Sequence, residues 1–123
     1  MSHIVTIKTK VTDPAALLAA CRRLGLEEPT QGTARLFSSN ATGLIVKLPG
    51  WTFPAVIDTA AGEVKFDTYN GAWGKQEELD KLLQAYAVER AKSEARRVGH
   101  SVTEQTLGDG SIKLVIQVSG GAA

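Results

Sequence analysis

The residues from Lys75 to Val98 constrain the fold more than any other stretch, because their pattern predicts one long amphipathic helix. Apolar side chains recur there every three or four positions, which places them on a single stripe of a helix. These side chains are Leu79, Leu82, Leu83, Tyr86, Ala87, Ala91, Ala95 and Val98. At about 1.5 Å per residue the helix is on the order of 36 Å long. It can therefore cross the whole width of a sheet in a domain of this size.

Both ends of this segment carry helix-boundary signals. Gly74 suits the N-cap, and Gly99 suits the left-handed position that follows the last turn. Acidic residues gather in the first turns and basic residues in the last turns, which complements the helix dipole. The rest of the chain must then supply a surface that covers the apolar stripe.

The N-terminal part predicts a strand followed by a short helix. Residues 3–11 alternate between apolar and polar side chains, as in a strand with one buried face. Asp13 is a strong N-cap candidate, Pro14 suits the first helical position, and Gly25 suits the left-handed stop. The side chains expected on the buried face of this helix are Leu17, Leu18, Cys21 and Leu24.

Between the two helices the pattern predicts four short strands. Residues 27–32 and 39–43 are polar turn clusters, and residues 60–62 suit a tight hairpin loop with a left-handed glycine. The predicted strands are residues 34–38, 44–48, 55–59 and 63–68. In the last of these strands the alternation places Asp67 on the solvent side.

A second hairpin is predicted after the long helix. Ser101–Thr106 and Ser111–Val118 flank a loop that contains Gly108-Asp109-Gly110. Within the second of these strands every other residue is apolar, which is the strongest strand signal in the chain. The apolar row consists of Ile112, Leu114, Ile116 and Val118.

The predicted element order is strand, helix, four strands, long helix and two strands. We therefore expect an α+β fold, in which a mainly antiparallel sheet of about five to seven strands carries two helices, one short and one long, on one face. Residues 1–118 are expected to form a single domain, and residues 119–123 a flexible C-terminal tail.

Composition indicates an ordinary globular protein. The 123 residues are 43% hydrophobic and 22% charged with a formal net charge of +1, so no global field attracts nucleic acid or an anionic membrane. No stretch approaches the ~20 apolar residues of a membrane span, and the N-terminus lacks a signal-peptide core. We therefore expect a cytoplasmic protein with no membrane partner. The single cysteine, Cys21, excludes an internal disulfide and a Cys-rich zinc site.

Several motifs along the chain resemble a known family. They are Met1-Ser2-His3, Thr6-Ile7-Lys8-Thr9-Lys10, Thr12-Asp13, Tyr86-Ala87, Glu94-Ala95 with Gly99, and Asp109-Gly110-Ser111-Ile112. On these residues the chain resembles the conserved chloroplast reading-frame proteins, number thirty-five in the plastid series, which occur in plastids, cyanobacteria and other bacteria. Residues 34–73 match the family only as a pattern of strands.

The family is a domain of unknown function, so the resemblance implies no reaction and no cofactor. It implies the element boundaries, a cytoplasmic setting and an accessory role. Through the genes that neighbour its members, it also implies another protein as partner, an AAA-type ATPase system.

No catalytic constellation stands out from the residues themselves. Gly108-Asp109-Gly110 lies between two strands, whereas a dinucleotide-binding loop requires a strand-to-helix turn. Asp58 and Asp67 could face each other on the two paired strands of the 60–62 hairpin. The alternative is that both carboxylates are solvated or out of register. We therefore expect no catalytic residue, no metal site and no cofactor, and we lean against an enzyme.

Basic side chains support a second hypothesis, an RNA- or DNA-binding domain. The candidate nucleic-acid contacts are Lys8, Lys10, Arg96 and Arg97. Arg96 and Arg97 lie in a final helical turn, where the helix dipole explains them equally well. The strand positions predicted to face solvent also lack the aromatic rings on which bases stack. A third and weaker hypothesis is a small-molecule pocket beneath the long helix.

Aromatic loops support the leading hypothesis. Residues 51–54 and 69–73 place four aromatic side chains in connecting segments. Loop aromatics often anchor a partner, although two tryptophans beside glycines could instead fold back over the core. We expect a non-catalytic protein-interaction or accessory module. Its candidate partner-binding residues are Trp51, Phe53, Tyr69, Asn70 and Trp73.

Overall fold

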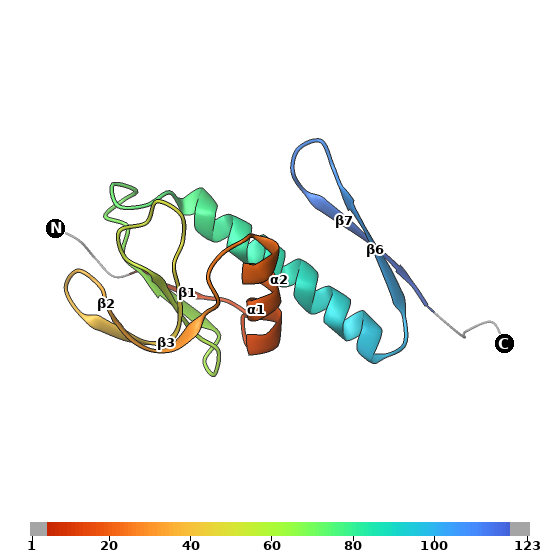
Figure 1. Ribbon diagram of the computed structural model, residues 1–123, viewed down its shortest axis with the longest axis horizontal. Helices are drawn as coiled ribbons and strands as arrows, with labels where there is room; N and C mark the ends of the chain where they lie inside the picture. Colours follow the sequence, from red (N-terminus) through yellow and green to blue (C-terminus); the bar gives the residue numbers. More distant parts are fainter. Residues whose placement is uncertain (1–4, 119–123) are drawn as a thin grey trace.

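The computed structural model describes residues 5–118, with backbone only at positions 5, 7 and 8, and confirms the predicted order of elements (Figure 1). In chain order these elements are β1 (Val5–Lys8), α1 (Pro14–Arg23), β2 (Thr30–Arg35), β3 (Asn40–Val46), β4 (Ala55–Asp58), β5 (Glu63–Phe66), α2 (Gln76–Arg97), β6 (Ser101–Thr106) and β7 (Ile112–Gln117). The predicted tail, residues 119–123, lies outside the described residues.

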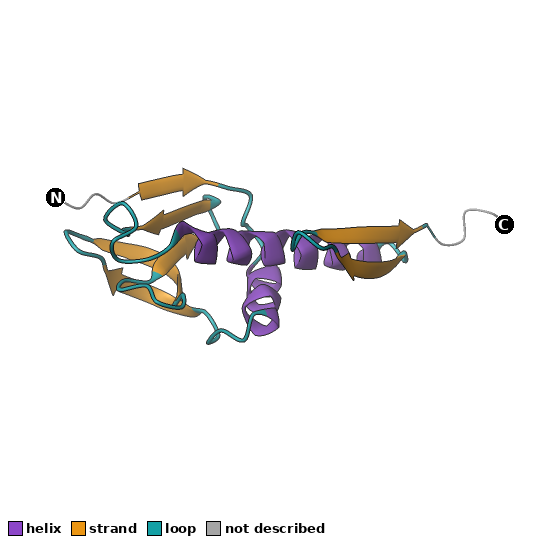
Figure 2. Cartoon of the chain, turned by 90° about the horizontal axis from the view of Figure 1, so that it is seen from above, coloured by secondary structure: helices purple, strands orange, loops and turns teal. Residues whose placement is uncertain are grey.

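The fold is α+β, as predicted, but its strands form two antiparallel sheets. The larger sheet has five strands in the order β1-β5-β4-β3-β2, and β6 pairs only with β7 in a separate two-stranded sheet. Figure 2 shows the larger sheet at one end of α2 and the β6–β7 hairpin beside the other end. The long helix therefore connects two regions that share no sheet.

The main hydrophobic cluster contains side chains from both helices and from the larger sheet. Leu17 and Cys21 of α1, Leu82 of α2, and Val46 and Ile57 of the sheet belong to it, each 0% exposed. The alternate residues of β3 and β4 enter a second, smaller cluster instead. That cluster comprises Leu36, Ala41 and Val56, with Ala34, Ile45 and Phe53 packed against it.

The helix boundaries follow the local signals closely. The Asp13 carboxylate accepts hydrogen bonds from the amides of Ala15 and Ala16, as an N-cap does. Gly25 has φ +71 and Gly99 has φ +82, so a left-handed glycine follows each helix. The N-cap of α2 is Lys75 and not Gly74 as predicted, because Gly74 still belongs to the preceding turn.

The apolar stripe of α2 differs from the predicted one. Val98 is 52% exposed and Ala87 is exposed, whereas Ala85 and Val88 are buried. The helix is covered on more than one side, since its first half contributes to the main cluster and its second half lies beside β6 and β7. In α1, Leu24 was expected in the core but is 38% exposed, because it occupies the C-cap position, beyond the last helical turn.

Two predicted turns are strands. Residues 30–32 belong to β2 and residues 40–43 belong to β3, where Gly32 pairs with Gly43 and Thr33 with Thr42. The polar composition is compatible with a ladder because β2 is an edge strand whose threonine and glutamine side chains are exposed. The turn between these strands is shorter than predicted and is closed by the bond from Leu36 N to Ser39 O, 2.8 Å.

Asp67 was expected in solvent but is only 1% exposed. It follows the last residue of β5, and its carboxylate accepts the backbone amide of Tyr69 in the next loop. Asp58 pairs with Glu63 across the hairpin, so the juxtaposition of Asp58 with Asp67 is wrong. Neither helix is long and apolar enough to cross a membrane, as far as the described residues go.

Candidate functional site

Four aromatic rings converge on one surface, which we call the aromatic surface (Phe37, Phe53, Tyr69 and Trp73). Trp73 lies at its centre, with ring centroids 4.9 Å from Tyr69, 5.0 Å from Phe37 and 5.5 Å from Phe53. Tyr69 is stacked on Trp73, and Phe53 meets it edge to face. These are the offset and T-shaped arrangements that aromatic rings favour.

The aromatic surface begins at the second hydrophobic cluster and continues into solvent. Phe53 packs against that cluster and is partly buried. Phe37 is 52% exposed and Tyr69 is 41% exposed, so the outer rings are not absorbed into a core. An exposed aromatic group of this kind suits contact with a second molecule.

Three segments carry these rings, and backbone hydrogen bonds connect two of them. The amide of Thr52 donates to the carbonyl of Trp73 at 2.8 Å, and the amide of Trp73 donates to the carbonyl of Thr68 at 2.9 Å. The buried carboxylate of Asp67 accepts the amide of Tyr69 at 3.1 Å. The second oxygen of Asp67 has no hydrogen-bond partner among the described residues. These hydrogen bonds therefore hold the loop that carries Tyr69 and Trp73 in place.

The same loop contains an unusual backbone. Tyr69 and Asn70 have φ of 48 and 52, in the left-handed region where residues other than glycine pay a steric penalty of about 1–2 kcal/mol. The surrounding hydrogen bonds hold this conformation, which brings the Tyr69 ring onto Trp73. Asn70 itself lies at the exposed tip and contributes a turn, not a ring contact.

Trp51 is not part of the aromatic surface. Its ring packs against the main cluster 5.5 Å from Phe66, and its indole Nε1 donates to the carbonyl of Lys75 at 3.0 Å. A Cβ added at Gly74 would lie 2.7 Å from the Trp51 ring, so glycine is required where the loop crosses it. The two tryptophans therefore differ: Trp51 closes the core, whereas Trp73 organises the exposed group.

Phe37 is the member that the sequence interpretation missed. It was assigned to the end of a strand, because it follows an alternating segment. It in fact lies in the tight turn between β2 and β3. A large ring followed by the turn-forming run Ser38-Ser39-Asn40 is the sequence signal that would have pointed to it.

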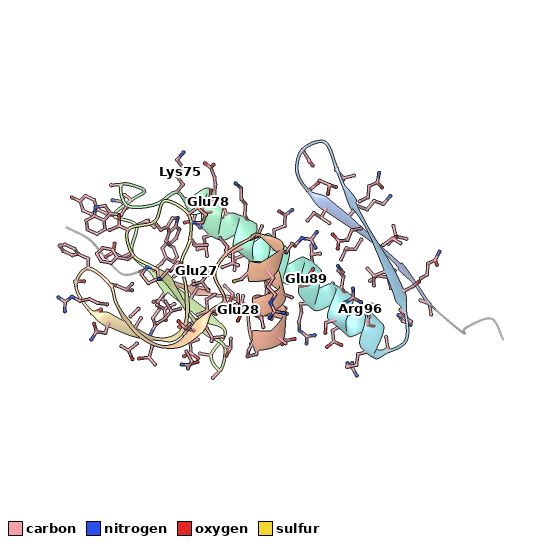
Figure 3. All side chains as sticks on the ribbon, viewed as in Figure 1. Glu27, Glu28, Lys75, Glu78, Glu89 and Arg96 are labelled. Atoms are coloured by element: carbon pink, nitrogen blue, oxygen red, sulfur yellow. The ribbon has the colours of Figure 1, made fainter. Side chains whose placement is uncertain are left out.

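The candidate nucleic-acid contacts are interleaved with acids. Lys10 is exposed and lines a groove together with Glu94, and the guanidinium of Arg97 bonds Glu94 at 2.9 Å. Hydrogen bonds from Arg90 and Arg97 lower the pKa of Glu94, which keeps it ionised among these bases. Figure 3 places Arg96 on the last turns of α2, at the end opposite Lys75. The side chain of Lys8 lies outside the described residues.

A groove of about 440 Å³ runs beside α2. Its floor is apolar, with Val11, Leu83, Tyr86 and Ala87, and its rim carries Lys10, Arg90 and Glu94. Arg90 already pairs with Glu94 at 2.5 Å and lies 3.7 Å from Asp13. Two of the three charged groups at the rim, Arg90 and Glu94, therefore bind each other.

Within residues 5–118, no group of three or more His, Cys, Asp or Glu side chains is placed to hold a metal ion. Burial raises the pKa of the Cys21 thiol to about 11, so the thiol is protonated and a poor nucleophile at neutral pH. No protein-family model, no curated protein and no solved structure matches the chain. The resemblance to the chloroplast reading-frame family therefore stays a prediction.

Proposed function

We propose that this protein is an interaction module that binds a protein partner through its aromatic surface. One observation carries the proposal: three rings pack around Trp73, yet Phe37 remains 52% exposed and Tyr69 41% exposed. Binding energy at protein interfaces is concentrated in tryptophan, tyrosine and arginine side chains that are desolvated on contact.

The preformed geometry favours this use. Tyr69 and Trp73 are already stacked, so little side-chain freedom is lost when a partner covers them. The Asp67 bond and the left-handed backbone at Tyr69 and Asn70 hold the loop in one conformation. A surface maintained at a conformational cost is more readily explained by binding than by stability.

A capture experiment with matched variants tests the proposal. The full chain is used as bait in a lysate of the source cells, beside Phe37→Ala, Trp73→Ala and the control Leu107→Ala. Leu107 is 39% exposed but lies on the β6–β7 turn, away from the aromatic surface. We expect wild type and the control to capture the same partner, and the two aromatic variants to lose it.

The partner found in this way is then purified and titrated against Trp51→Phe. In that variant Trp73 is the single remaining tryptophan, since the chain has two. We expect its emission to shift to shorter wavelength as the partner excludes water. Equal capture by all folded variants, or an unchanged emission at saturation, would contradict the proposal. Capture of nucleic acid that disappears at high salt would favour the RNA- or DNA-binding alternative.

The groove beside α2 supports a second candidate function, binding of a small apolar ligand with a charged group. The apolar floor and the Lys10, Arg90 and Glu94 rim are what such a ligand would need. Replacing Ala87 with tryptophan would fill the floor. A compound that raises the melting temperature of wild type, but not of Ala87→Trp, would support this candidate, and a screen without such a compound would count against it.

A further inference from the structure

The second strand of the C-terminal hairpin has an open edge and an apolar row that its own chain covers only in part. β7 pairs with β6 on one side, and no other strand of the described residues lies beside it. Ile112 and Leu114 are partly buried, whereas Ile116 is 44% and Val118 is 70% exposed. Long, apolar, open strand edges are templates for pairing with another chain.

The hydrogen-bond pattern shows which amides face this edge. Leu107 N donates to Ser111 O at 2.8 Å, which closes the ladder at the turn. Because hydrogen-bonded and non-hydrogen-bonded pairs alternate in an antiparallel ladder, Lys113, Val115 and Gln117 direct their backbone groups to β6. The backbone groups of the alternate residues, Ile112, Leu114 and Ile116, therefore face outward.

We propose that the open edge of β7 pairs with β7 of a second copy of this chain, antiparallel and with the two-fold axis at Val115. In this register Leu114 lies opposite Ile116 of the second copy, and Ile112 lies opposite Val118. Both of these pairs join residues whose backbone groups face outward, so the ladder can form. Two-fold symmetry makes the contact closed, as in most homodimers.

In this register the exposed half of the apolar row on one copy lies beside the partly buried half of the apolar row on the other copy. Glu104 lies opposite Leu114 within the hairpin and bonds to Lys92 of α2, so this face of the hairpin is turned toward the helix. The exposed Ile116 and Val118 therefore meet the half of the second copy's apolar row that its own helix covers. The uncovered half of each row is buried by the dimer.

Charge and the extent of the apolar row select this register over its neighbours. With the axis at Val115, Lys113 lies opposite the neutral Gln117. An axis at Lys113 would oppose two lysines, which is unfavourable in a directly paired position. An axis at Leu114 would leave Val118 without an apolar partner, and an axis at Ile116 would leave Ile112 without one. Among these registers, the axis at Val115 is the one that pairs all four apolar residues with one another.

Sedimentation of the full chain over a concentration series tests the association. A single added strand pair buries less surface than a standard interface, so we expect dimers with a dissociation constant of about 1–100 µM. Val115→Lys places two lysines at the axis and is expected to weaken the dimer about tenfold or more. Thr103→Lys is the matched control, because Thr103 is the β6 partner of Val115 and lies on the same hairpin face, one strand from the interface.

Cysteine cross-linking tests the register. With a mild oxidant, Val115→Cys should give a disulfide-linked dimer, because the Cα atoms of a non-hydrogen-bonded pair are about 4.5 Å apart. Lys113→Cys should not, since the two introduced thiols are then about 13 Å apart along the strands. Cys21 is buried and does not interfere.

A chain that stays monomeric throughout the series overturns the proposal. Equal cross-linking of Lys113→Cys and Val115→Cys overturns the register. Open-ended filaments, or a dimer that Val115→Lys leaves intact, show that another edge or surface associates.

Discussion

The body of this protein and its C-terminal arm are held together by different forces. The body, made of β1–β5, α1 and the first half of α2, shares a main cluster in which many side chains are fully buried. The arm, made of the second half of α2 with β6 and β7, combines ion pairs with apolar side chains that are only partly buried, such as Ile112 and Leu114. Arg23 of α1 bonds Glu89 and Glu104, and Lys92 bonds Glu104 at 2.5 Å.

Among the described residues, most exposed aliphatic side chains lie in the arm, whereas the exposed rings of Phe37 and Tyr69 lie in the body. In the arm, Val98, Leu107, Val115, Ile116 and Val118 are 39% to 70% exposed. A two-stranded hairpin is marginally stable in water, and partly exposed ion pairs contribute little each. A region built in this way is expected to open more often than the body, and to gain stability when another molecule covers it.

The largest expected effect comes from truncating one leucine in each region. Leu82 is 0% exposed in the main cluster, so Leu82→Ala should lower the free energy of unfolding by about 2–5 kcal/mol. Leu114 is only partly buried in the arm, so Leu114→Ala should cost about 1 kcal/mol in dilute solution. Urea unfolding followed by circular dichroism measures both. Equal losses for the two variants would remove the distinction between body and arm.

A smaller effect is expected from a single hydroxyl in the body. The Tyr86 hydroxyl accepts the amides of Thr12 and Asp13, both at 3.1 Å, and donates to the carbonyl of Lys10 at 3.3 Å. Tyr86→Phe leaves these partly buried groups without their partner and should cost about 1–3 kcal/mol. Urea unfolding again provides the measurement. If Tyr86→Phe alters amide exchange only in β6 and β7, its loss of stability is confined to the arm, and the assignment of Tyr86 to the body is wrong.

Low pH is expected to have the smallest effect on the stability of the whole protein, but to act selectively on β6. Hydrogen bonds from Arg23 and Lys92 lower the pKa of Glu104 to about 2, below its ordinary value of 4.5. Because the folded-state pKa is depressed, the attachment it supports is complete above about pH 4.5 and is lost as pH falls toward 2. Amide exchange in β6 should therefore accelerate over this window.

Glu104→Gln provides the control for that measurement. The variant should exchange faster in β6 at neutral pH and should lose the additional acceleration that wild type shows below pH 4.5. The surface pair of Arg22 and Glu28 is 64% and 63% exposed, so Glu28→Gln should leave β6 unchanged. If amide exchange in β6 accelerates below pH 4.5 equally in wild type and in Glu104→Gln, other carboxylates cause the acceleration.

The sequence predicted the parts of the fold that short-range chemistry determines. Asp13 and Pro14 start α1, and Gly25, Gly62 and Gly99 occupy left-handed positions as expected. These features depend on residues close in the chain. Most of the predictions that failed depend on distant neighbours, although the N-cap of α2 and the exposure of Leu24 were missed for local reasons.

The strand and burial errors illustrate this limit. Thr30–Gly32 resembles a turn, yet it pairs with β3 because an edge strand tolerates polar side chains on its exposed face. The alternation in β7 predicted a strand correctly but could not say what would cover it. The alternation of β5 places Asp67 in solvent, yet Asp67 is buried and its carboxylate accepts the amide of Tyr69 in the loop that follows β5.

The sequence pointed to three of the four rings of the aromatic surface as candidates but not to their contact with one another, and their binding of a partner stays a prediction. Phe53 and Tyr69 both contact Trp73, whereas Trp51 belongs to the core and Phe37 was missed. Both tryptophans stand next to a glycine in a loop, so local sequence cannot separate them. They differ in their distant neighbours: Trp51 packs against Phe66 and the main cluster, whereas Trp73 packs against Phe53 of the second cluster.

Residue-resolved amide exchange by NMR, at low and at high protein concentration, tests the division between body and arm most directly. We predict that the amides of Val56 and Ile57 in β4 exchange slowly at both concentrations. The amides of Lys113, Val115 and Gln117, which face β6, should exchange faster in dilute protein than those of β4. The outward amides of Ile112, Leu114 and Ile116 should become protected as concentration rises. If the three amides that face β6 are as protected in dilute protein as those of β4, the arm is stable on its own and the account is wrong.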